Sequence, residues 1–223
     1  MPSYEKSRPM SPVDISEFLR KLGVGRRFLD ASFANYRGAE KLIRQIRSAI
    51  DEVPLPNVFM FGVTGSGKSH LAVSILRDHF ESGRAYGKRI IYTTSTEFFY
   101  KLKQAIDLAS EYERLIRSAI ECDLLVLDDL GSEKVSEWSV EVLSMIIDKR
   151  YCELRPVIAS SNLPPAEVQE RYGARVASRL CTGYSFAIEM SDYRKIIAAS
   201  RSMPGPASNR DFQTKRGEEV RNG

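Results

Sequence analysis

The chain has few cysteines and no long apolar run, and both absences limit what kind of protein it is. Its 223 residues include only three cysteines, and Cys122, Cys152 and Cys181 form no C-x-x-C pair. This pattern argues against a zinc site or a disulfide framework and favours a reducing cytoplasm. No apolar stretch reaches the length of a membrane span, and the first eight residues lack the apolar region of a secretory signal. We therefore expect a cytoplasmic protein without a membrane partner.

The charge balance and length leave most other classes open. The net charge of +4 permits contact with nucleic acid but does not establish it. No internal repeat is visible, and the length suits one α/β domain with short appendages. Residues 1–12 and 201–223 have the polar composition of disordered segments. Residues 14–22 carry apolar side chains at helical spacing, which predicts either a partner-docking helix or a helix that packs on its own domain.

The most informative motif is the run Gly62-Val63-Thr64-Gly65-Ser66-Gly67-Lys68-Ser69, which fits the phosphate-binding pattern G-x-x-x-x-G-K-[ST]. An apolar run at 57–61 precedes it, and apolar residues at helical spacing follow. Strand, glycine loop and helix point several backbone N–H groups at one anion. We expect Lys68 to contact the β- and γ-phosphates and Ser69 to offer its hydroxyl to Mg²⁺. The alternative, a glycine turn with a chance Lys-Ser pair, leaves the flanking elements unexplained.

Two carboxylates follow the apolar strand expected at 124–127. Ligands of open α/β sheets bind at the carboxyl ends of strands, which predicts that Asp128 and Asp129 lie beside the phosphate loop. We expect Asp128 to hold Mg²⁺ through water, and Asp129 to orient or deprotonate the attacking water. The alternative is a pair of surface acids at the start of a loop.

The alternation of elements predicts the fold. Strands expected at 57–61, 89–93, 124–127, 157–160 and 185–190 alternate with helices, which indicates a five-stranded parallel sheet covered on both faces. The helix expected from residue 136 carries Trp138, Val142, Met145 and Ile146, which we place on one face. A further strand between the two motifs favours the additional-strand class of P-loop ATPases, and the absence of an N-K-x-D motif argues against a GTPase. We expect a three-layer α/β P-loop NTPase.

The predicted boundaries are a short extension at 1–36, for partner docking or packing, an ATPase domain at 37–200 and a disordered tail at 201–223. No large C-terminal lid domain is expected.

Two later segments carry polar residues that suit phosphate chemistry. Asn162 ends the fourth strand, where it would contact the γ-phosphate or the attacking water, or form an Asx turn before two prolines. Arginine stabilises charge on a transferring phosphoryl group, including from a neighbouring subunit, which makes Arg175 and Arg179 candidates. A solvated basic helix is the alternative, and spacing alone favours it.

Together these motifs resemble one family, the DnaC/IstB-like AAA+ ATPases. The resemblance rests on residues 62–72, 125–138, 161–163 and 178–180, with 26–33 similar to the segment before the ATPase core, and it covers 22–194. The family contains bacterial and phage replicative helicase loaders and ATPase subunits of some transposition systems. The resemblance implies ATP and Mg²⁺ as cofactors, hydrolysis between subunits of a head-to-tail homo-oligomer, and assembly on DNA.

The resemblance also implies roles by matching position. Asp129, Asn162 (as sensor 1) and Arg179 (as arginine finger, with Arg175 in reserve) would be catalytic, and Ser69 and Asp128 would hold the metal. The nucleotide would be bound by Gly62, Val63, Thr64, Gly65, Ser66, Gly67, Lys68, Ser69, His70 and the C-terminal Arg194.

The helical insertion before the second motif is linked in this family to single-stranded DNA. Here it spans 94–121 and carries Phe98, Phe99, Tyr100, Lys101, Lys103, Arg114 and Arg117. Such residues stack on bases and track phosphates, or they are core aromatics and solvated charges.

Three functions remain open at this point. The first is a helicase loader that engages single-stranded DNA and a replicative helicase. The second is an IstB-like transposition ATPase that assembles on duplex DNA and recruits a transposase. The third, a nucleotide-binding adaptor without turnover, is disfavoured because both carboxylates and Asn162 are present.

Overall fold

The computed structural model describes residues 12–37 and 39–189. Its centre is one sheet of five strands in which all neighbouring pairs are parallel, in the order β2-β3-β4-β1-β5. The strands are β1 (Val58–Phe61), β2 (Ile90–Thr94), β3 (Leu124–Leu130), β4 (Val157–Ser161) and β5 (Tyr184–Ala187). The expectations for Arg194 and for the two chain ends lie outside the described residues.

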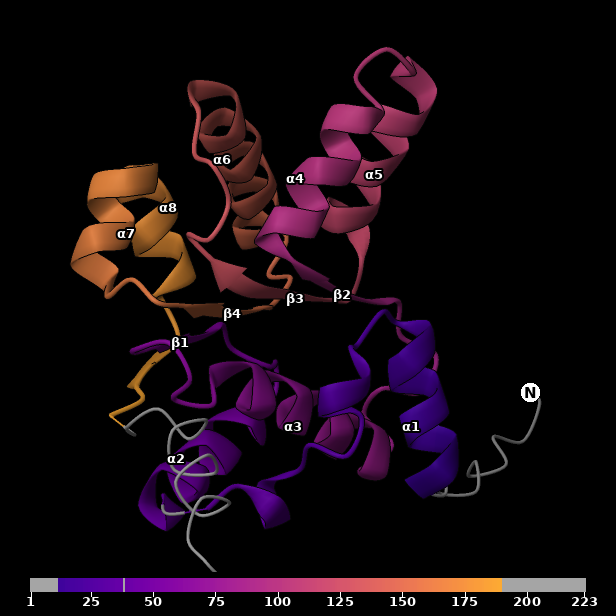
Figure 1. Ribbon diagram of the computed structural model, residues 1–223, viewed down its shortest axis with the longest axis vertical. Coiled ribbons are helices and arrows are strands. Elements are labelled where there is room, and N and C mark those ends of the chain that lie inside the picture. The colour runs from indigo at the N-terminus through magenta and orange to yellow at the C-terminus, as the bar shows by residue number, and fades with distance from the viewer. Residues whose placement is uncertain (1–11, 38, 190–223) are drawn as a thin grey trace, which may run out of the picture.

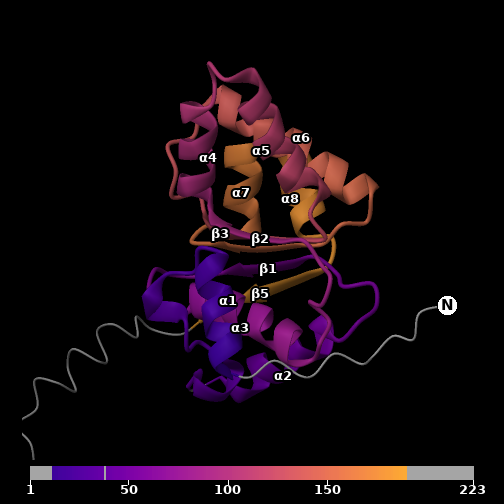
Figure 2. The same ribbon diagram turned by 90° about the vertical axis from the view of Figure 1, so that its right-hand side faces the viewer.

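Helices cover both faces of this sheet, as Figures 1 and 2 show. One layer holds α1 (Pro12–Lys21), α2 (Glu40–Ile50) and α3 (Lys68–Glu81), with the short 3-10 turns η1 (Arg26–Phe28) and η2 (Phe33–Asn35). The other holds α4 (Ser95–Gln104), α5 (Ala109–Glu121), α6 (Glu137–Cys152), α7 (Pro165–Tyr172) and α8 (Ala174–Leu180). The predicted three-layer α/β fold is confirmed, and within the described part of the chain no lid domain follows the sheet.

Strand alternation explains why the molecule has two cores. Successive side chains of a strand point to opposite faces of the sheet. Leu124 and Val126 therefore pack with the layer of α1–α3, whereas Leu125 and Leu127 pack with α4–α8. A strand buried on both faces reads as a continuous apolar run, which is why these strands were visible in the sequence.

Three expectations about elements need correction. β3 runs on to Leu130, beyond the apolar run 124–127 and one residue past the pair of carboxylates that was expected to end the strand. On α6, Val142 and Ile146 are buried, whereas Met145 is 39% exposed, because the buried stripe is centred between Val142 and Leu143. β5 begins at Tyr184, one residue earlier than predicted, and ends at Ala187.

The first helix packs on its own domain. Ile15 and Leu19 of α1 are fully buried in the same core cluster as α3. The ring of Phe18 lies 4.6 Å from that of Phe80, centroid to centroid. The apolar face of α1 is thus covered, which favours packing over the docking alternative. Among the described helices, none combines the length and apolar character needed to cross a bilayer.

Candidate functional site

The phosphate loop connects β1 to α3 in a wrap that requires glycine at two positions. Gly67 precedes the first residue of α3 with φ +96°, and a Cβ there would lie 2.6 Å from the Tyr36 ring. A Cβ on Gly62, where φ is +156°, would lie 2.4 Å from the Ile188 carbonyl oxygen. Side chains are excluded by both contacts, so the backbone N–H groups of the loop stay open to an anion at the N-terminus of α3.

Lys68 is held over this loop. Its buried Nζ donates to the carbonyl oxygens of Gly62 at 2.8 Å and Val63 at 2.9 Å, and to Oδ1 of Asn162 at 2.7 Å. The ammonium therefore lies where the loop, α3 and the end of β4 meet. Asn162 does not close the predicted Asx turn. The hydroxyl of Ser161 accepts the turn bond from the Leu163 N–H at 3.0 Å instead, which leaves the Asn162 amide free to enter the site.

Asn162 also reaches the second carboxylate. Its Nδ2 donates to Oδ1 of Asp129 at 3.1 Å, so one amide joins Lys68 to Asp129. The Asp129 backbone adopts φ +58°, a left-handed conformation that is uncommon outside glycine. Although the two carboxylates are adjacent in β3, Asp129 contacts the Asn162 amide, whereas Asp128 contacts a different set of groups.

Asp128 is buried among hydroxyl groups. Its Oδ1 accepts from Ser69 Oγ at 3.1 Å and from the hydroxyl of Ser160, and its Oδ2 accepts from the Tyr92 hydroxyl at 2.9 Å. Burial, with Asp128 adding to it, raises the pKa of Tyr92 far above its ordinary value, so the phenol remains a donor. Sequence reasoning missed Tyr92 and Ser160, because these residues reach Asp128 only when β2 and β4 pair with β3.

This donor set fits Mg²⁺. Ser69 and Asp128 present a hydroxyl and a carboxylate oxygen close together, and oxygen is the ligand type that Mg²⁺ prefers. Residues 12–37 and 39–189 contain no cluster of three or more His, Cys, Asp or Glu side chains that would cage a metal. That suits an ion held by one or two protein groups and by substrate phosphates.

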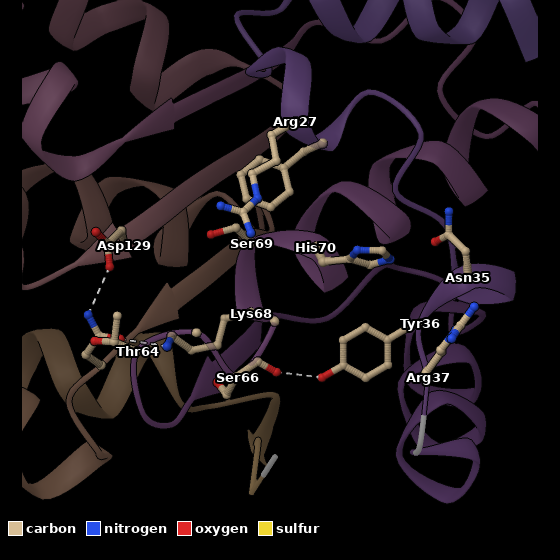
Figure 3. Close-up of a pocket in the computed structure, with 14 residues that line it drawn as sticks. Arg27, Asn35, Tyr36, Arg37, Thr64, Ser66, Lys68, Ser69, His70 and Asp129 are labelled. Carbon is tan, nitrogen blue, oxygen red and sulfur yellow. Dashed lines mark hydrogen bonds between the residues drawn. The ribbon is translucent and has the colours of Figure 1, made fainter. Parts of the chain in front are cut away.

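A cavity of about 320 Å³ opens above the loop. Its lining includes residues of the loop, Asp129 and Asn162. The remaining wall comes from the N-terminal segment, namely Arg27, Phe28, Asn35, Tyr36 and Arg37 (Figure 3). The cavity therefore unites residues of the expected ATPase domain with residues of the segment that was expected to be a separate extension.

Tyr36 and His70 fix this wall to the loop. The Tyr36 hydroxyl donates to the Ser66 carbonyl oxygen at 2.9 Å, and burial raises its pKa to about 12. The His70 Nε2 lies 3.0 Å from the Ser32 carbonyl oxygen, and burial lowers the pKa of the imidazole. The segment before residue 37 was expected only to dock a partner or to pack. Its similarity to the family segment at 26–33 was the available signal for a larger role.

The two candidate arginines lie elsewhere. Arg175 and Arg179 of α8 both pair with Asp148 of α6, Arg175 through Nε at 2.7 Å. The Arg179 guanidinium also lies 5.3 Å from the Tyr151 ring centroid. Neither arginine lines the cavity of its own chain. Arg175 is 68% exposed and Arg179 is 19% exposed, so Arg175 is the more accessible of the two.

The α4–α5 insertion offers less to nucleic acid than its sequence suggested. Phe98 and Phe99 are buried, and Phe99 packs edge-on against Trp138. Three of its basic residues pair with acids one turn away on the same helix, in the pairs Lys101–Glu97, Arg114–Glu111 and Arg117–Glu113, whereas the Lys103 ammonium lies 5.8 Å from the Trp138 ring centroid. Tyr100, which is 63% exposed, is an aromatic residue of the insertion that remains available for stacking.

Comparison with known proteins finds similarity to an ATP-binding family and to replicative helicase loaders. The family described as IstB-like ATP binding protein matches residues 11–180. The replicative helicase loader DnaC of Escherichia coli strain K12 is 26% identical over 163 residues, covering 70% of this chain and 65% of the loader. The loader of Buchnera aphidicola subsp. Schizaphis graminum is 24% identical over 200 residues, covering 85% of this chain and 80% of its own.

Solved structures agree on the fold. A crystal structure of the DnaC helicase loader superposes with a TM-score of 0.66 at 26% identity, covering 74% of this chain and all of that one. The AMPPCP-bound DnaA of Aquifex aeolicus shares the fold with a TM-score of 0.62 at 22% identity, covering 76% of this chain and 54% of DnaA. The sheet, the phosphate loop and the family match lead to one conclusion: the chain belongs to the IstB-like ATP-binding family and has an AAA+ P-loop fold.

Proposed function

We propose that this chain is an ATPase that binds ATP and Mg²⁺ in the cavity between the phosphate loop and the 27–37 segment. The observation that carries the proposal is the Asn162 amide, which joins Lys68 to Asp129 at the rim of the loop. This arrangement brings a cation for phosphate and a base for water to one place.

Each residue then has a distinct task in the reaction of ATP and water to ADP and phosphate. Lys68 would exchange the Gly62 and Val63 carbonyls for phosphate oxygens. Ser69 and Asp128 would hold Mg²⁺, which offsets negative charge on the β- and γ-phosphates when bound. Asp129 would accept the proton of the attacking water, and Asn162 would orient that carboxylate.

The first test compares single substitutions in nucleotide binding and turnover. Lys68→Ala should abolish binding of a fluorescent ATP analogue. Asp129→Asn should keep binding and reduce turnover on the order of a hundredfold or more, because it removes a general base. Lys88→Ala, at an exposed lysine, serves as the control. Unchanged turnover in Asp129→Asn would exclude this mechanism.

Completion of the site by a second copy is the next part of the proposal. Since neither Arg175 nor Arg179 lines the cavity of its own chain, an arginine of α8 would enter the cavity of a neighbouring copy. Such head-to-tail contacts generate rings or open helices. An isolated subunit would hydrolyse ATP slowly, so the rate per subunit should rise with protein concentration.

A mixing experiment tests this arrangement sharply. Lys68→Ala and Arg179→Ala should each be inactive alone, whereas their mixture should regain activity at interfaces that combine an intact lysine with an intact arginine. The same mixture with Arg175→Ala decides which arginine acts. A site shared between copies would be ruled out by two results together. The mixture would be as inactive as each variant alone, and the wild-type rate per subunit would not change with protein concentration.

For the cellular role, we propose a helicase loader that engages single-stranded DNA and a replicative helicase. The similarity to proteins named as replicative helicase loaders supports this role. Such a protein works in the cytoplasm, where its three free cysteines stay reduced. Pull-down with the replicative helicase of the host, with and without an ATP analogue, tests it, and binding that ignores the nucleotide would contradict it.

The family match favours a second candidate, a transposition ATPase that assembles on duplex DNA and recruits a transposase. Filaments that form on duplex DNA in ATP, with weaker binding to single strands, would support this candidate over the loader.

A further inference from the structure

Glu133 is a buried carboxylate that the proposed mechanism does not use. It lies in the loop after β3, four positions beyond Asp129, and is only 5% exposed. Its Oε2 accepts from the Gly131 N–H at 3.0 Å and contacts Ser95 Oγ at 2.5 Å, and its Oε1 accepts from the Tyr172 hydroxyl. No Lys, Arg or His in the described ranges forms an ion pair with it.

Burying a carboxylate costs desolvation free energy, and here only hydrogen bonds from neutral donors offset that cost. Ser95 and Tyr172 are themselves buried, and Glu133 does not line the nucleotide cavity. Its contacts instead join three elements: the loop after β3, the first residue of α4 and the last residue of α7.

One of these partners leads directly to Asp129. The Ser95 hydroxyl lies 2.5 Å from Glu133 Oε2 and 2.8 Å from the Asp129 carbonyl oxygen, so these two acceptors share its one proton, while the Asp129 N–H donates to Ser160 Oγ at 2.9 Å. The left-handed backbone of Asp129 is therefore held on both sides. A strained conformation of this kind persists only where its surroundings fix it.

The other partner leads to the arginine-bearing helix. Tyr172 ends α7, and only Gly173 separates it from α8, which carries Arg175 and Arg179. The hydrogen bond from Tyr172 to Glu133 thus connects the junction of α7 and α8 to the loop after β3.

We propose that Glu133 is a positioning residue: it holds Asp129 in its left-handed conformation and ties this residue, through Tyr172, to α7 and α8. The inference rests on the proposed function, since it assigns Asp129 to hydrolysis. It adds that an arginine engaged at a subunit contact and the base for water are linked within one chain.

Three substitutions separate hydrogen bonding from charge and from packing. Glu133→Met keeps most of the volume and removes every acceptor. Glu133→Gln keeps an oxygen for Gly131 and Ser95, and its amide donates to the Tyr172 oxygen. Tyr172→Phe removes one hydroxyl and keeps the ring. Glu167→Met, at an exposed glutamate of α7, is the control.

The readouts are kcat, the affinity for a fluorescent ATP analogue, and hydrogen exchange of the backbone amides at 129–132 in the nucleotide-free protein. Glu133→Met should lower kcat about tenfold or more, because a small misplacement of a catalytic group is expensive, with analogue affinity within about twofold. Glu133→Gln should restore kcat to within about threefold of wild type. Tyr172→Phe should raise exchange at 129–132, although the substitution lies in another element.

Unchanged kcat and unchanged exchange at 129–132 in both Glu133→Met and Tyr172→Phe would overturn the inference. Loss of analogue affinity in parallel with kcat would overturn it too, since that outcome means general destabilisation. If Glu133→Met does not fold, Tyr172→Phe decides alone. A wild-type chain that binds ATP without hydrolysing it would refute the proposed function. In that case the hydrogen-exchange data would still test whether Glu133 and Tyr172 fix the backbone at 129–132.

Discussion

At the scale of single residues, the clearest feature of the site is that hydroxyl groups hold Asp128 from three sides. Ser69, Ser160 and Tyr92 come from α3, β4 and β2, and each donates to one of the two carboxylate oxygens. Ser69 is the expected metal ligand, whereas Tyr92 and Ser160 orient the carboxylate from behind. Groups that orient a ligand in this way contribute to metal affinity without touching the metal.

Tyr92→Phe should therefore weaken Mg²⁺ binding. The substitution keeps the ring and removes the donor to Asp128 Oδ2, so the carboxylate loses its fixed orientation. We expect the Mg²⁺ concentration that half-saturates analogue binding to rise about tenfold. A Mg²⁺ titration of analogue fluorescence measures this, with the exposed Tyr86→Phe as the matched control. Equal midpoints for the two variants would show that Tyr92 does not orient the metal ligand.

At the scale of elements, α3 begins at the phosphate loop and also anchors the wall of the cavity. Arg77, buried on α3, donates from Nε to the Ala31 carbonyl oxygen at 2.9 Å and from Nη2 to the Leu29 carbonyl oxygen and to Ser16 Oγ at 3.2 Å. The helix that begins with Lys68 therefore also anchors the segment that leads to Tyr36.

Arg77→Met should release this segment. Two carbonyl groups would lose their charged donor inside the protein, which costs about 3 kcal/mol of unfolding free energy. Binding of the ATP analogue should weaken as well, because the cavity wall is no longer fixed. Urea unfolding and analogue titration measure the two effects.

The matched control is Arg44→Met on α2, because Arg44 is exposed and its pair with Glu40 spans 3.8 Å. Exposed pairs of this type contribute less than about 1 kcal/mol. Similar losses of stability in the two variants would contradict the anchoring role of Arg77.

At the scale of the whole molecule, both histidines of the chain lie on α3, where His79 is buried and His70 is half-buried at the cavity. Burial lowers the pKa of His70 and of His79 below the ordinary value. At His79, Arg84 lowers the pKa further, while Asp78 and Asp51 oppose it. The unfolded chain therefore binds protons at a higher pH than the folded protein does.

Stability should accordingly fall on acidification. The contribution of each histidine is fully present above about pH 6.5 and is lost as the pH falls through the lowered folded-state pKa, by at most about 1.4 kcal/mol per pH unit. Urea unfolding between pH 7.5 and 5 measures the slope. His79→Gln should reduce it, and an identical slope in that variant would refute the assignment.

The sequence predicted those features that depend on residues close together in the chain. The phosphate loop, the apolar strands and the order of elements follow from short patterns, because backbone requirements at Gly62 or Gly67 and burial on both faces mark neighbouring residues. The continuation of β3 to Leu130 was missed, because two carboxylates after an apolar run mark the end of a buried strand and the start of a loop equally well.

What the sequence by itself determined is the kind of site: a lysine, a hydroxyl, two carboxylates and an amide at the ends of parallel strands. Only the tertiary structure decided which groups surround them. Tyr92 meets Asp128 through strand pairing, Tyr36 meets Ser66 through the packing of a remote segment, and Glu133 meets Tyr172 across three elements. These contacts join residues far apart in the chain, and no local pattern records a distance that folding alone creates.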